Sequence, residues 1–221
     1  MREYEPMTAI ELNIERSGEV GGRHERADAA ANRRLLLATA EQLFARDGVA
    51  QVTMADIAAA AGVGKGTLYR RFDNKAELAL ELMDDQTRAF QDEVLAALRS
   101  FEERGAPYLA RLDYFLDVLV RFTDQHLPLL CVVQSTGLLN EEREQSRPYH
   151  WQVQTVSGLL ERGIAARELR DTIDIPYTAD ALLSPLRADI FRFQRQARGF
   201  STERMSAGLR ALARGMSSKD Q

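Results

Sequence analysis

Residues 53–75, which read TMADIAAAAGVGKGTLYRRFDNK, contain two short helical patterns separated by a glycine-bearing turn. Thr53 is a favourable N-cap for the first pattern, and Asp56, three residues later, can complete a capping box. Gly62 supplies the backbone freedom that a tight turn needs. The second pattern, at residues 65–72, places Leu68 and Phe72 on one face at i, i+4 spacing. Two short helices joined by such a turn predict a helix-turn-helix, whose second helix enters a DNA major groove.

The second of these helices keeps polar side chains on its outer faces. They are Lys65, Thr67, Tyr69, Arg70 and Arg71. Cations, a hydroxyl and a phenol on so short a helix suit contacts with phosphates and base edges. Residues 23–75 also carry nine Lys/Arg and six Asp/Glu, a net charge of +3, which leaves −7 for the rest of the chain. A locally basic module on an acidic body favours docking through one face, although charge alone leaves an ordinary solvated surface open.

Four segments in the same order and spacing resemble the N-terminal domain of TetR-type transcriptional regulators. They read LATAEQLFARDG at 37–48, VTMADIA at 52–58, AGVGKGTLYRRF at 61–72 and NKAEL at 74–78. The resemblance runs from residue 32 to about residue 82, roughly a quarter of the chain. It implies a transcriptional regulator that binds a double-stranded DNA operator. Repression is the common mode in this family, and the sequence does not decide between repression and activation.

The resemblance assigns the DNA contacts residue by residue. The set is Thr53, Lys65, Gly66, Thr67, Tyr69, Arg70, Arg71 and Lys75. Thr53 would bind a phosphate through its hydroxyl or amide, and Tyr69 and Lys75 match positions that usually anchor phosphates. The start of the recognition helix, at residues 65–67, would reach base edges, where Lys65 or Arg70 could read guanine. Residue 64 is glycine where many relatives carry serine, which removes one possible phosphate contact.

Composition and motifs give no support to a catalytic or metal-binding protein. The sole cysteine, Cys131, excludes both a disulfide framework and a zinc-site spacing. The three histidines, at positions 24, 126 and 150, are too far apart to form a helical metal pair. Residues 59–66 fail as a phosphate-binding loop, because positions 59 and 66 are alanine and glycine where the motif needs glycine and a hydroxyl residue. No cofactor, metal or catalytic residue is predicted. A helical lipid or acyl-group carrier would leave the helix-turn-helix unexplained.

The sequence predicts a cytoplasmic protein without a membrane partner. The longest apolar run, residues 127–133, contains Pro128 and is far shorter than the roughly 18 residues of a membrane span. The first residues are rich in glutamate and do not resemble a signal peptide.

The chain is expected to be all-α in three parts. Residues 1–27, with three glycines, would be a flexible extension, although the basic residues just before residue 27 could also touch DNA. Residues 28–75 would form the DNA-binding domain, with a first helix capped by Asp28 and ended by Gly48. Residues 76–221 would form a helical ligand-binding and dimerisation domain. A long fourth helix from Asn74 to about Phe101 would join the two, and Pro128 would begin or kink a later helix.

The resemblance further implies a homodimer and a small-molecule inducer. One apolar face near the C-terminus is the predicted dimer interface, with core packing inside one subunit as the alternative. It consists of Leu182, Leu183, Leu186, Ile190 and Phe193. The inducer would bind among the middle helices, and its chemistry and contacts are left unassigned. The residues that a pocket there would offer are Phe115, Phe122, His126, Cys131, Tyr149, His150 and Trp151.

Overall fold

The computed structural model describes residues 14–135 and 147–218. Within these two ranges the regular elements are helices, and the pairing of Leu169 with Ser217 is an isolated bridge outside any strand. The prediction of an all-α protein is confirmed. The described residues form two compact units that divide after Lys75. Over the same residues, no helix is both long enough and apolar enough to cross a membrane.

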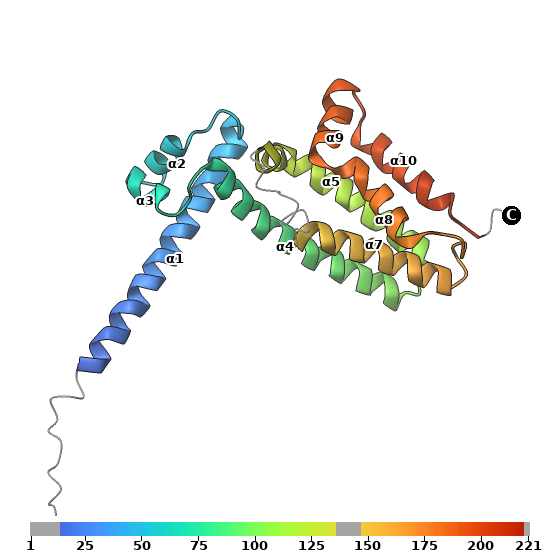
Figure 1. The fold of residues 1–221 in the computed structure, drawn as a ribbon, viewed down its shortest axis with the longest axis horizontal. Coiled ribbons are helices and arrows are strands. Elements are labelled where there is room, and N and C mark those ends of the chain that lie inside the picture. Colours follow the sequence, from blue (N-terminus) through green and yellow to red (C-terminus); the bar gives the residue numbers. More distant parts are fainter. Residues whose placement is uncertain (1–13, 136–146, 219–221) are drawn as a thin grey trace, which may run out of the picture. The chain divides into compact units, whose positions relative to one another are not determined.

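The N-terminal unit is built from three helices, α1 (Ile14–Asp47), α2 (Met54–Ala60) and α3 (Lys65–Tyr69) (Figure 1). α2 packs against both α1 and α3. Its core is a set of buried apolar side chains from all three helices and their connections. They include Leu36, Leu37, Ala40, Leu43 and Phe44 of α1, Val49 and Val52, Ile57 and Ala58 of α2, and Leu68 and Phe72. Leu36, Ala40, Leu43 and Phe44, which recur at helical spacing, therefore lie on the face that α1 buries.

α1 is longer at its N-terminal end than the sequence predicted. It begins at Ile14, so Asp28 lies inside the helix and is not its N-cap. The predicted flexibility of residues 1–27 does not hold for residues 14–27, which are helical, while residues 1–13 lie outside the described residues. Each glycine in this stretch is about 1 kcal/mol less favourable than alanine, yet extending an existing helix needs no new nucleation. The stretch also contains no proline, which would have ended the helix.

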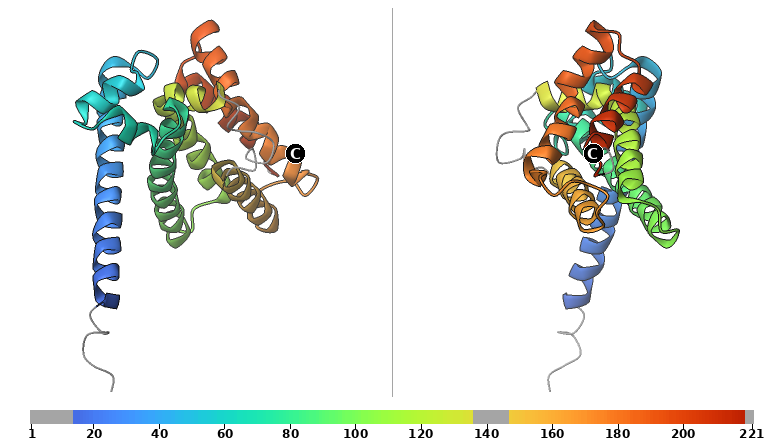
Figure 2. Two further views of the ribbon diagram at one scale, coloured as in Figure 1. Left: turned by 60° about the vertical axis from the view of Figure 1, so that its left-hand side comes forward. Right: turned by 90° about the vertical axis from the view of Figure 1, so that its right-hand side faces the viewer.

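The second unit is a bundle around α5. Its helices are α4 (Lys75–Glu103), α5 (Tyr108–Ser135), α7 (Arg147–Ala165), α8 (Ile175–Leu183), η2 (Ser184–Leu186), α9 (Ala188–Arg192), η3 (Phe193–Ala197) and α10 (Thr202–Arg214) (Figure 2). α5 packs against α7, α9 and α10, and α7 packs against α8. The core of this unit centres on Phe115, Leu116, Leu160 and Phe191, which are fully buried.

Three ion pairs fasten the C-terminal helices to α5. They are Asp113–Arg214 at 2.8 Å, Asp117–Arg210 at 2.7 Å and Asp124–Arg195 at 2.6 Å. The aspartates lie on α5, and their partners lie on α10 and η3. Asp113 and Asp117 are four residues apart, as are Arg210 and Arg214, so one turn of α5 meets one turn of an antiparallel α10.

Two predictions about the second unit need correction. Pro128 lies inside α5, which runs from Tyr108 to Ser135, so it does not begin a helix, and the predicted kink stays a prediction. The residues of the single apolar face predicted at 182–193 do not share one helix, because α8 ends at Leu183 and the 3₁₀ turn η2, which contains Pro185, follows. At Arg187 the backbone leaves helical geometry, with ψ 138°, before α9 begins. The charged residues at 138–148 also predict an exposed connection, and most of it lies outside the described residues.

Candidate DNA-binding surface

A Schellman turn sets the angle between α2 and α3. Gly62 adopts a left-handed conformation, with φ 67°, that few residues with a Cβ tolerate. Its amide donates to the Ala59 carbonyl at 3.2 Å, and the next amide, of Val63, donates to the Ala58 carbonyl at 3.0 Å. These two bonds satisfy carbonyls at the end of α2 and reverse the chain within a few residues. Gly64 then serves as N-cap of α3 without a side-chain hydrogen bond.

Two buried side chains orient α3, whose other side faces solvent. Leu68 and Phe72 are fully buried, as predicted. Lys65, Gly66, Tyr69, Arg70 and Arg71 are exposed, and Thr67 is half-buried. Across residues 14–135 and 147–218, no carboxylate forms an ion pair with Lys65, Arg70 or Arg71. The outer side of α3 therefore presents three uncompensated positive charges, which is the arrangement that phosphates and guanine edges attract.

Gly66 lies on this outer side without a packing reason in the protein itself. A Cβ built there meets no atom within 4 Å, and its φ is not among the positive values. The fold therefore accepts a larger residue at this position. A missing side chain here lets another molecule approach the backbone of α3 closely.

Thr53 and Asp56 form the predicted capping box at the start of α2. The Asp56 amide donates to Thr53 Oγ1 at 3.2 Å, and the Thr53 amide donates to Asp56 Oδ2 at 2.8 Å. The Thr53 hydroxyl also donates to the same carboxylate oxygen at 2.6 Å. These bonds, from the Thr53 hydroxyl first and its amide second, lower the pKa of Asp56. Both groups of Thr53 that were predicted to hold a phosphate are thus bound to Asp56, and the phosphate contact stays a prediction.

Lys75 makes intramolecular contacts that the sequence did not reveal. Its Nζ donates to the carbonyls of Val49 at 2.8 Å, Val52 at 3.0 Å and Ala50 at 3.4 Å. All three carbonyls belong to the connection between α1 and α2. An ammonium has three donors, so these bonds use its full capacity. The role of Lys75 as a phosphate anchor remains a prediction, but the ammonium is already occupied in this structure.

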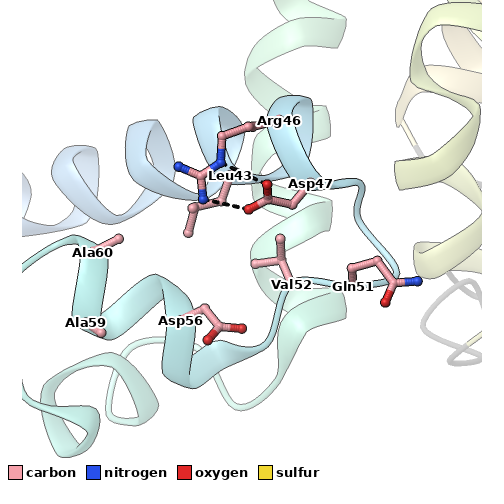
Figure 3. A pocket seen from close by; sticks show the side chains of 8 residues that line it. All are labelled: Leu43, Arg46, Asp47, Gln51, Val52, Asp56, Ala59 and Ala60. Carbon is pink, nitrogen blue, oxygen red and sulfur yellow. Dashed lines mark hydrogen bonds and ion pairs between the residues drawn. The ribbon is translucent and has the colours of Figure 1, made fainter.

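A shallow hollow of about 360 Å³ lies between the end of α1 and α2 (Figure 3). Leu43 and Val52 form part of its wall, and Arg46, Asp47 and Asp56 line it as well. Arg46 and Asp47 pair with each other, Nη2 to Oδ2, at 2.6 Å. This hydrogen bond raises the pKa of Arg46 and lowers that of Asp47. The hollow contains none of the eight residues predicted to contact DNA.

An aromatic cluster fills the space between α4, α5 and α7 in the second unit. Phe90 stacks on Phe122 with ring centroids 4.3 Å apart, and Trp151 meets Phe90 and Phe115 edge-on at 6.1 and 5.6 Å. The His126 ring lies 4.5 Å from that of Phe122. Four of the predicted pocket residues thus come together. Phe90 of α4 was not among the predicted pocket residues, because its partners in this cluster are far along the chain.

The remaining pocket residues lie elsewhere. The Tyr149 hydroxyl donates to Asp180 at 2.8 Å, and His150 is exposed. Cys131 is partly buried, which raises the pKa of its thiol, and it lies beside Arg192 and Asp189 of α9.

The predicted dimer face divides into two groups. Leu182, Leu183 and Leu186 are buried in the core of this unit, so their assignment to a dimer interface is wrong and the alternative, packing inside one subunit, holds for them. Ile190 and Phe193 are exposed, the latter by 58%. The break at η2 explains the division, because it ends the single helical face on which all five residues were placed.

The model for bacterial regulatory proteins of the tetR family matches residues 36–82. This match begins in α1, contains the whole α2–turn–α3 motif and ends in the second turn of α4. Residues 36–82 thus have the sequence pattern of the TetR-family DNA-binding domain. The resemblance inferred from the four sequence segments is therefore confirmed.

Similar proteins are described as HTH-type transcriptional regulators. TtgR of Pseudomonas putida, an HTH-type transcriptional regulator, is 44% identical over 62 residues, which cover 28% of this chain and 30% of that protein. SAR2658 of Staphylococcus aureus, also an HTH-type transcriptional regulator, is 28% identical over 182 residues, which cover 80% and 90% of the two chains. The match to TtgR is thus confined to under a third of that relative.

The likeness in fold to solved transcriptional regulators extends over most of the chain. A putative transcriptional regulator from Saccharomonospora viridis, solved in complex with choline, has a TM-score of 0.68 over 85% of this chain and 98% of that chain. The two sequences are 22% identical, so the likeness concerns the fold alone.

Proposed function

We propose that this protein is a cytoplasmic, ligand-responsive repressor of the TetR family that binds a near-palindromic operator as a homodimer. The observation that carries the proposal is the outer side of α3. Lys65, Arg70 and Arg71 are exposed there without a partner carboxylate among the described residues, while Leu68 and Phe72 anchor the opposite side. A rigidly anchored, positively charged short helix suits entry into a major groove.

The proposed dimer interface lies on the outer surfaces of the C-terminal helices. Large apolar side chains are exposed there on α8, α9, η3 and α10. They are Tyr177, Ile190, Phe193 and Leu212. Phe193 and Leu212 are 58% and 63% exposed, and a second copy of the chain would remove them from water. Two-fold symmetry would then present two α3 helices to half-sites about one helical turn apart, or at a related spacing.

The proposed ligand site is the aromatic cluster around Trp151. Its rings already touch, so a ligand entering here must displace at least one of them, and Phe90 is the member that α4 carries. Aromatic faces hold apolar groups and quaternary ammonium groups well, and the structural neighbour from S. viridis was solved with choline. α4 carries both Phe90 and Lys75, the residue bound to the α1–α2 connection. A ligand would release DNA only if it binds the conformation with weak DNA affinity more tightly than it binds the conformation that holds DNA.

Selection from a random pool of duplex DNA tests this function directly. The full-length protein should enrich a near-palindromic sequence, and a variant with Lys65→Ala, Arg70→Ala and Arg71→Ala should enrich none. Failure of the wild-type protein to enrich any sequence, or enrichment of the same sequence by the triple variant, would contradict DNA recognition by α3.

A further inference from the structure

We infer that Lys75 is a positioning residue, which closes the α1–α2 connection and so holds the start of α2 in place for DNA binding, and is not a phosphate anchor. Its Nζ lies 2.8, 3.0 and 3.4 Å from the carbonyls of Val49, Val52 and Ala50. We call this set of three bonds the Lys75 clip. The effect of the clip on DNA binding rests on the proposed function, but its effect on the DNA-free protein does not.

The clip answers a local need of the backbone. Gly48 ends α1 in a left-handed conformation, with φ 83°, and the chain turns through residues 49–51 before α2 begins. No N–H group of the described helices therefore donates to the carbonyls of Val49, Ala50 and Val52. The side chains of Val49 and Val52 are buried. A cation just beyond a helix C-terminus satisfies such carbonyls and interacts favourably with the helix dipole.

The clip also connects segments that are distant in sequence. Lys75 is the first residue of α4 and follows the turn after α3, whereas its partners lie 23–26 residues earlier. Val52 directly precedes Thr53, the N-cap of α2. Fixing the Val52 carbonyl thus fixes the residue before the capping box. Contact of the Lys75 ammonium with a phosphate would have to break these bonds, since an ammonium has no fourth donor.

The chemistry of lysine and arginine separates the two roles. A phosphate anchor tolerates arginine, because a guanidinium binds phosphate at least as well as an ammonium. The clip needs a compact cation whose donors diverge toward three carbonyls, and the planar guanidinium does not supply that geometry. Lys75→Arg therefore keeps the charge and loses the clip, and Lys75→Met loses both.

The experiment compares hydrogen exchange in the DNA-free, full-length protein. Backbone amides of residues 48–58 should exchange at least tenfold faster in Lys75→Met and in Lys75→Arg, while those of α5 should be unchanged. The exposed-lysine control, Lys65→Met, should leave residues 48–58 as in the wild type. Alkylation of Lys75→Cys with 2-bromoethylamine, in a Cys131→Ala background, restores an ammonium of lysine length and should restore protection.

Binding to the selected operator gives the second arm. If Lys75 were a phosphate anchor, its removal would lower the slope of log affinity against log salt by about one. Arginine at position 75 would then restore the affinity. If Lys75 acts through the clip, Lys75→Arg should bind the operator more weakly than the wild type. The inference would be overturned if residues 48–58 of Lys75→Arg exchanged at the wild-type rate. It would also be overturned if Lys75→Met exchanged at the wild-type rate and its salt slope were reduced by about one. The hydrogen-exchange measurement needs no DNA, so its result does not depend on whether the proposed function is correct.

Discussion

Thr53 illustrates how a single residue can serve both the fold and the proposed DNA contact. Its hydroxyl accepts from the Asp56 amide and donates to the Asp56 carboxylate, and its own amide donates to the same carboxylate. A phosphate at this position would approach a carboxylate whose pKa is already lowered, so it would meet a negative charge at neutral pH. We therefore expect Thr53 to contribute less to operator affinity than an exposed side chain that forms no ion pair within the described residues, such as Arg71.

Gly66 gives a residue-scale prediction in which stability and binding move in opposite directions. Gly66→Ala should stabilise the free protein by about 1 kcal/mol, because alanine is the better helix former and its Cβ meets no atom within 4 Å. The same Cβ should weaken operator binding at least tenfold by keeping the DNA away from α3. Urea unfolding and fluorescence anisotropy measure the two effects. Gly158→Ala on α7, where a Cβ also has open space, is the control that should leave binding unchanged.

At this scale, what could be predicted from sequence depended on the distance between partners. The capping box at Thr53 and the turn at Gly62 involve neighbours within a few residues, so residue types and spacing were enough to predict them. The partners of Lys75 are backbone carbonyls 23–26 residues away. Every residue has a carbonyl, so no residue type marks these three as acceptors, and only the folded chain identifies them.

At the scale of elements, the three ion pairs along α5 hold the C-terminal helices in register. Asp124 and Arg195 are each about one-third exposed on their side chains, and Arg195 also donates to the Phe200 carbonyl at 2.7 Å. Removing the carboxylate leaves a half-buried guanidinium with only part of its bonds. Such partly buried, charge-assisted contacts contribute more than exposed pairs.

Asp124→Ala should lower the free energy of unfolding of the second unit by about 1–2 kcal/mol. Asp85→Ala, which removes an exposed pair with Arg88 on α4, is the matched control and should change it by less than about 0.5 kcal/mol. Urea unfolding measures both. Equal effects of the two substitutions would show that the link between α5 and η3 adds nothing beyond an ordinary surface pair.

Element boundaries were harder to predict than element types. Apolar residues recur at helical spacing from Leu182 to Phe193, and this pattern continues through η2 without marking the break at Arg187. Proline does not mark the helix boundaries either, since Pro185 lies where a helix ends and Pro128 lies inside α5. Periodicity reports which side of a segment is apolar, and it does not report whether the backbone stays helical.

At the scale of the whole molecule, the proposed dimer depends on side chains that the single chain leaves exposed. The sequence pattern could not separate them from the core, because core and interface positions are both apolar. Burial separates them: Leu183 is 2% exposed and Phe193 is 58% exposed. Only the second kind of residue is available to a partner subunit.

Phe193→Asp should therefore convert the protein into a monomer and weaken operator binding at least tenfold, because the two α3 helices would no longer bind together. Leu95→Asp, at an exposed apolar position on α4, is the control and should remain dimeric. Sedimentation velocity at micromolar concentration measures the oligomeric state. A Phe193→Asp variant that sediments as a dimer would place the interface elsewhere.

The most direct test of the central claim is the affinity of Arg70→Ala for the selected operator, measured beside Arg99→Ala. Arg70 lies on the exposed side of α3, and Arg99 is an exposed arginine of α4 in the second unit, so the two variants lose the same charge in different places. Recognition by α3 requires Arg70→Ala to bind roughly ten- to a hundred-fold more weakly, with Arg99→Ala within about twofold of the wild type. Equal affinities for the two variants would contradict the claim that α3 is the DNA-reading helix.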